Sequence, residues 1–147
     1  MATPDNNYKG TPYTHIYSSF LSKINDYNLA ELDKEDLEEV LQDYLISALT
    51  KFTACKKDLS KRNDYEKVFE EVLDNQEIEI IANFMVVEWL NPSLNTLENL
   101  SQAMPHRDFR MSSQSTFLRE LRLTKGEALK EANRLMTEYS YRMRDLP

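Results

Sequence analysis

The chain has 147 residues, 41% of them hydrophobic and 29% charged, with a formal net charge of −7 at pH 7. This length and composition are those of one folded domain, and the net negative charge disfavours a dedicated reader of duplex DNA. Cys55 is the single cysteine, which excludes an internal disulfide and a cysteine-only zinc site, and no apolar run is long enough to indicate export or membrane insertion.

Only two glycines occur in the chain, so tight hairpins and glycine-rich phosphate-binding loops are not expected. Apolar residues recur mainly with the period of a helix. We therefore expect an all-α fold, a small bundle of about four to five helices with a long C-terminal helix. The chain is expected to form a single domain, with an extended N-terminal arm at 1–13, a helical core at 14–138 and a C-terminal tail at 139–147.

The N-terminal third predicts an arm followed by two helices. Residues 1–13 carry proline, glycine and paired asparagines without a helical period. Thr14 is expected to cap a first helix, whose apolar face runs through 16–24. Asp33 is expected to cap a second helix, in which 37–52 forms an unbroken apolar stripe opposite acidic side chains.

The middle of the chain predicts a short helical piece at 65–73 and then a central helix. Asp74 and Glu77 have the spacing of a capping box, and 78–90 is apolar almost all round. The β-branched residues would also suit a buried strand, but the length and the capping signal favour a helix. This helix is expected to end before Pro92, because proline lacks the amide donor and restricts the preceding residue.

The remaining segments predict a short helix at 94–104, an exposed loop at 105–112 and a long final helix. The final helix is expected to begin at Ser112 or Ser113, and Gly126 weakens its middle. The side chains expected to face the core are Phe117, Leu118, Leu121, Ala128, Leu129, Ala132, Leu135, Met136 and Tyr139.

The sequence offers no recognisable catalytic, cofactor-binding or metal-binding set, so we expect a protein that is not an enzyme. His15 and His106 are the only histidines and belong to no metal-ligand motif. Cys55 is interpreted as an ordinary thiol at a helix end. Glu88, within the apolar helix, would need a partner such as Arg119 or Arg122 if it were buried; a surface position is the alternative.

Two segments are candidates for protein contacts. The loop at 105–112 alternates basic and aromatic residues, which suits contact with phosphate or with an interface on another protein. The tail from 139 onward has the same character and would be a docking peptide if it extended from the last helix. The interaction candidates are Arg107, Phe109, Arg110, Tyr139, Tyr141, Arg142, Met143 and Arg144.

Charge is divided unevenly along the chain. Residues 1–104 hold 9 basic and 19 acidic side chains, whereas residues 105–147 hold 9 basic and 6 acidic ones. Opposite charge at two ends would favour head-to-tail packing between copies. Separately solvated helix faces are the simpler interpretation, and the sequence leaves both open.

The order of segments resembles that of the small helical head-tail connector, or adaptor, proteins of tailed bacteriophages. The resemblance spans 13–143. It is carried by the helix at 33–52, the apolar segment EIEIIANFMVVEWLNP at 77–92, the DFRMSSQ segment at 108–114 and the last helix ending in YSYRM.

The resemblance implies a structural virion protein of the phage neck, assembled in the bacterial host cytoplasm. Such a protein forms a ring of about twelve copies between the portal and the tail, around the DNA exit channel. Its partners would be the portal protein and the next neck or tail-completion protein, with DNA passing through without specific recognition. The alternative is a small helical regulator or inhibitor that binds one host partner through the regions of Phe109 and Tyr141.

Overall fold

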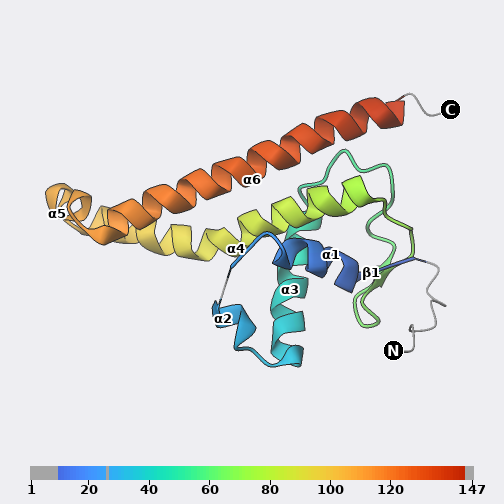
Figure 1. Cartoon of the computed structure of the whole chain (residues 1–147), viewed down its shortest axis with the longest axis horizontal. Coiled ribbons are helices and arrows are strands. Elements are labelled where there is room, and N and C mark those ends of the chain that lie inside the picture. Colours follow the sequence, from blue (N-terminus) through green and yellow to red (C-terminus); the bar gives the residue numbers. More distant parts are fainter. Residues whose placement is uncertain (1–9, 26, 145–147) are drawn as a thin grey trace.

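The computed structural model describes residues 10–25 and 27–144, and the fold is mainly helical, as predicted. Figure 1 shows α4 and α6 lying side by side along the long axis, with α5 at the end where they connect and α1 and α3 against the other side of α4. The elements are β1 (Thr11–Pro12), α1 (Tyr13–Leu21), α2 (Tyr27–Ala30), α3 (Lys34–Leu49), β2 (Arg62–Asn63), β3 (Val68–Phe69), α4 (Asn75–Ala103), α5 (His106–Arg110) and α6 (Ser113–Arg144).

Helix α4 is the centre of the fold, and its start agrees with the predicted capping box. The Asp74 side chain accepts a hydrogen bond from the Glu77 N–H, and the Glu77 carboxylate accepts one from the Asp74 N–H, both at 2.8 Å. Residues 80–87 are all buried, because α6 covers one side of the helix while α1 and α3 cover others. The segment at 78–90 is therefore part of a buried helix, as predicted, and not the buried strand that its β-branched residues also allowed.

The predicted end of this helix before Pro92 is wrong. Helix α4 continues through Pro92 to Ala103, so the separate helix expected at 94–104 is its second half. Pro92 lies on the exposed side, while Leu90, Leu94 and Leu97 on the inner side are buried. Burial of these leucines offsets the amide hydrogen bond that proline removes.

The predicted start of α1 is wrong, whereas the predicted start of α3 is confirmed. Helix α1 begins at Tyr13, with Pro12 at the N-cap position and no side-chain cap, so the cap predicted at Thr14 is wrong and lies two residues too late. Helix α3 begins as predicted, with the Asp33 side chain accepting a hydrogen bond from the Asp36 N–H at 2.9 Å. Of the predicted arm, 1–9 lies outside the described residues.

A small antiparallel sheet replaces the helical piece predicted at 65–73. Its strand order is β1-β3-β2, and Phe69 pairs with Thr11 on one side and Arg62 on the other. The turn between β2 and β3 forms without glycine. The Asn63 side chain accepts hydrogen bonds from two turn amides, and Lys67 takes the left-handed conformation with φ of 59°. Asparagine can thus supply the turn that the low glycine content argued against.

Helix α6 begins at Ser113, as predicted, and packs along most of α4. Leu118, Ala128 and Ala132 are buried as expected. Phe117 is not; 49% of it is exposed, because Leu118 fills the position that faces α4 and the adjacent residue points about 100° away.

Candidate functional site

The segment at 105–112 is a capped helical turn rather than the loop predicted. Phe109 is only 6% exposed and packs at the end of the α4 and α6 pair, so the expectation that its side chain is exposed is wrong. The Ser112 hydroxyl donates to the Phe109 carbonyl at 2.7 Å and closes the turn. Arg107 and Arg110 are exposed. The alternation of basic and aromatic residues therefore places the Phe109 ring in the core and the two guanidinium groups in solvent.

Exposed apolar side chains at this end of the molecule come from positions outside the predicted set. Met111 is 79% exposed, and Phe117 is half exposed. Phe117 also lines a groove of about 310 Å³ with Pro92, Thr96 and Leu97 of α4. Phe117 and Leu118 are neighbours in one helix and cannot share one face, so Phe117 points outward when Leu118 is buried. This adjacency was the sequence signal for the exposed surface.

The C-terminal segment is not a free tail over its described part, because α6 continues to Arg144. Tyr139 is completely buried, Met143 is half-buried against the core, and the Arg142 guanidinium pairs with Asp74 at 2.7 Å. These three interaction candidates are therefore used within the fold. Residues 145–147 lie outside the described residues.

Besides Arg142, whose side chain is partly exposed, two members of the predicted C-terminal set face solvent. Tyr141 is 59% exposed, and the Arg144 guanidinium lies 5.2 Å from the centre of its ring. Both line a groove of about 650 Å³ between the turn after α3 and the last turns of α6, together with Ala54, Met136 and Ser140. The size of this groove suits a short peptide segment.

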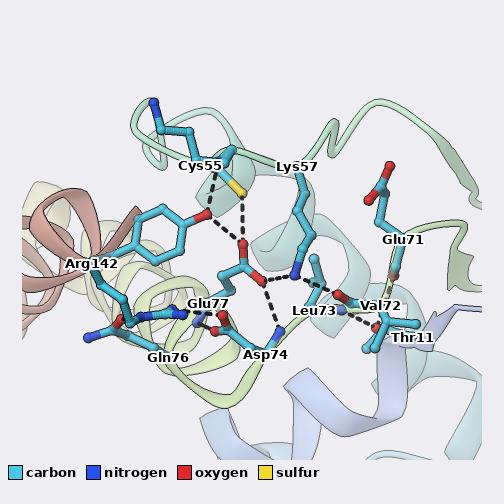
Figure 2. Close-up of polar contacts among 12 residues, drawn as sticks. Thr11, Cys55, Lys57, Glu71, Val72, Leu73, Asp74, Gln76, Glu77 and Arg142 are labelled. Atoms are coloured by element: carbon cyan, nitrogen blue, oxygen red, sulfur yellow. Dashed lines mark hydrogen bonds and ion pairs between the residues drawn. The ribbon is translucent and has the colours of Figure 1, made fainter. Parts of the chain in front are cut away.

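Glu77 is the centre of a buried polar network (Figure 2). Its carboxylate accepts hydrogen bonds from the Tyr139 hydroxyl at 2.6 Å and from the Lys57 ammonium at 2.7 Å, besides the amide of Asp74. The Tyr139 hydroxyl in turn accepts from the Lys56 N–H at 2.9 Å. Three distant parts of the chain therefore meet at one carboxylate, which satisfies the polar groups that burial would otherwise leave unpaired.

The sequence predicts Glu77 only as a helix cap, whereas the structure also buries its side chain. Ile80 and Ile81 follow it at the spacing of one helical face, and that spacing was the signal that the carboxylate points into the core. The carboxylate singled out instead, Glu88, is half exposed, and Arg122 pairs with Glu98 at 3.6 Å. The surface alternative for Glu88 is therefore the correct one.

The chemistry of the network is structural. Burial raises the pKa of the Cys55 thiol, and the nearby negative charge of Glu77 also raises it. The thiol is therefore protonated at neutral pH. Burial and the hydrogen bond to Glu77 raise the pKa of Tyr139 as well. Neither group is prepared for nucleophilic attack or proton transfer at neutral pH.

The described part of the chain shows neither a metal-ligand cluster nor a membrane-crossing helix. Among residues 10–25 and 27–144, no three His, Cys, Asp or Glu side chains gather closely enough to hold a metal ion. His15 and His106 lie exposed on separate elements. Within the same described ranges, no helix combines the length and apolar character needed to cross a membrane.

An acidic face lies on α3, far from the arginines of α5. Glu35, Asp36, Glu39 and Asp43 are exposed there, and none of them forms an ion pair within the described residues. The acidic face on α3 and the exposed arginines of α5 thus lie in different parts of the molecule (Figure 1).

Comparison with known proteins places the chain in a phage context. No curated protein and no solved structure matches it. The model of one protein family, described as the YomZ prophage protein, matches residues 10–138, from the glycine before β1 almost to the end of α6. The match covers most of the chain, and the protein therefore belongs to the YomZ prophage protein family.

Proposed function

We propose that this chain is a non-enzymatic structural protein of the phage neck, where copies form a ring between the portal and the tail around the DNA exit channel. Membership in a prophage family supports a phage role, and the order of segments resembles that of head-tail connectors. The proposed location is the virion neck, after assembly in the host cytoplasm.

The observation that carries the proposal is the length of the α4 and α6 pair, which separates two exposed surfaces. Helix α6 has 32 residues and so extends about 48 Å. Met111 and Phe117 are exposed near its start, and Tyr141 near its end. A ring protein of the neck must contact neighbouring copies as well as the proteins above and below it, and a stiff helix pair with a contact surface at each end offers separate places for such contacts.

The charge of the chain is compatible with a channel through which DNA passes. Each copy carries a net charge of −7, so a ring of copies repels the phosphate backbone instead of binding it tightly. We place one axial partner, the portal protein or the next neck or tail-completion protein, at the Tyr141 end of the helix pair.

Deletion of the gene from the inducible prophage that encodes it tests this function. We expect induced cells to accumulate DNA-filled heads and separate tails in electron micrographs, and a plasmid copy of the gene to restore intact particles. Mass spectrometry of purified wild-type virions should detect the chain. Normal particle yields after deletion, with the chain absent from virions, would refute the neck role.

The groove beside Tyr141 favours a second candidate, a small regulator that binds one host protein. Its volume of about 650 Å³ suits a peptide segment of a partner. This candidate predicts a one-to-one complex with a host protein in light scattering and a chain that is absent from virions. The virion analysis described above therefore separates the two functions.

A further inference from the structure

We propose that copies of this chain contact each other head to tail, with the basic end of one copy against the acidic face of the next. The basic end comprises Arg107, Arg110, Met111, Phe117 and Arg119. The acidic face comprises Glu35, Asp36, Glu39 and Asp43. This inference rests on the proposed ring and names the surfaces that would join its subunits.

The basic end combines unpaired positive charge with exposed apolar side chains. Residues 105–125 contain five basic and two acidic residues. Arg107, Arg110 and Arg119 are exposed and form no ion pair among the described residues. Met111 is among the most exposed large hydrophobic side chains, and Phe117 borders the groove on α4. Arginine beside exposed methionine and aromatic side chains is typical of the centre of protein interfaces.

The acidic face has the complementary charge on a regular surface. Residues 31–43 contain seven acidic residues and one lysine. Glu35, Glu39 and Asp43 follow one another at intervals of four, so they lie along one side of α3. Like charges at this spacing destabilise a helix, and a positive partner would remove that cost. Leu32, at the start of this surface, is also partly exposed and could contact Met111.

The two surfaces cannot meet within one molecule. Figure 1 shows α5 at one end of the long axis, while the start of α3 projects from the side of α4 opposite α6. A contact between them must therefore join two copies. Because the joined surfaces differ, a joined pair keeps one free surface of each kind, so copies add until the rotation closes the assembly into a ring. Nucleic acid is the competing occupant of the basic end, and the net charge of −7 makes it the less favourable one.

Charge reversal tests the contact on the full chain. One variant carries Arg107→Glu with Arg110→Glu, and the other carries Glu35→Lys with Glu39→Lys. In sedimentation velocity at low salt, we expect the wild-type chain to form oligomers. Each variant should associate more weakly by a factor of about ten or more, because like charges then face each other. The four substitutions combined in one chain, or the two variants mixed, should restore oligomers, because opposite charges face each other again.

A control variant reverses charges elsewhere. Glu70→Lys with Glu127→Lys changes two exposed side chains outside both surfaces and should leave association unchanged. Circular dichroism confirms that each variant is folded. A wild-type chain that stays monomeric at millimolar concentration would overturn the proposal, as would folded reversal variants that associate normally or a combined variant that does not recover.

The outcome is distinguishable from the test of the neck role. If the chain is absent from virions but reversal and recovery occur, the contact stands and the neck role fails. If the chain is present in virions but the combined variant does not recover, the contact proposed here is wrong. Loss of binding to a labelled DNA duplex by the Arg107→Glu and Arg110→Glu variant, without any effect on association, would assign the basic end to nucleic acid instead.

Discussion

The Tyr139 hydroxyl joins two segments through one oxygen atom. It donates to the Glu77 carboxylate and accepts from the amide of Lys56, so the last turns of α6 are held to the start of α4 and to the loop after α3. The ring itself packs edge-on against Phe52, with the ring centres 5.3 Å apart. The hydroxyl and the ring therefore contribute separately to the same junction.

Removing only the hydroxyl tests the polar part of this junction. Tyr139→Phe leaves the ring in place but deprives the buried Glu77 carboxylate and the partly buried Lys56 amide of a partner. We expect the free energy of unfolding to fall by about 1–3 kcal/mol, measured by urea denaturation. Tyr141→Phe is the matched control, because that tyrosine is exposed, and it should change stability little. Equal stability of the two variants would show that water or other groups replace the lost bonds.

At the scale of elements, the two glycines have opposite roles. A side chain at Gly10 would place its Cβ 1.7 Å from the Phe69 carbonyl oxygen of β3, which no rotamer can relieve. A side chain at Gly126, in the exposed middle of α6, would meet nothing within 4 Å. Glycine is thus required beside the sheet and dispensable in the helix.

Alanine at each position should consequently shift stability in opposite directions. Gly126→Ala is expected to stabilise the protein by about 1 kcal/mol, because alanine has the higher helix propensity. Gly10→Ala is expected to destabilise it by about 2 kcal/mol or more, because the strand must move away. Thermal denaturation of both variants beside the wild type measures the difference. A stabilising effect at Gly10 would mean that β1 does not need to approach β3 this closely.

Local signals in the sequence predicted those elements that local interactions determine. The caps at Asp33 and Asp74 depend on side chains within three residues of the helix start, and both form as expected. The continuation of α4 past Pro92 depends on burial of Leu94 and Leu97, a property of the whole fold that the proline signal cannot report. The β2 and β3 hairpin is likewise held by pairing with the distant β1.

The candidate site was harder to predict than the fold for the same reason. Composition correctly marked Arg107 and Tyr141 as exposed, but it could not tell which neighbouring aromatic side chain faces the core. Phe109 and Tyr139 turn inward because the ends of α4 and α6 need large side chains to fill them. Phe117 turns outward because Leu118 already occupies the inner position. Exposure at each site is decided by packing between helices.

At the scale of the whole molecule, carboxylates fasten α4 to the elements on both sides of it. Asp74 pairs with Arg142 of α6, and Glu79 accepts hydrogen bonds at 2.6 Å from Lys23 and from Ser19 of α1. Partial burial raises the pKa of each carboxyl group, but the hydrogen bonds and the positive partners outweigh it, so both pKa values lie below their usual range.

This arrangement gives the stability of the protein a defined dependence on acid. The folded chain holds these two carboxylates ionised at pH values where the unfolded chain has begun to protonate them, so the unfolded state binds more protons. The stabilisation is therefore complete at neutral pH and is lost progressively as the pH falls from about 5 through the lowered pKa values. We expect the urea midpoint to decline steadily over that interval.

A variant identifies the contribution of the link between α4 and α6. Arg142→Ala removes the cation but leaves the Asp74 cap, so the pKa of Asp74 should rise towards its usual value. The variant should be less stable than the wild type at neutral pH, and the difference should shrink in acid, because protonation removes the same ion pair from the wild type. Parallel curves at all pH values would indicate that Arg142 stabilises the helix end through its contact with the Tyr139 ring, 5.4 Å away, instead of through charge.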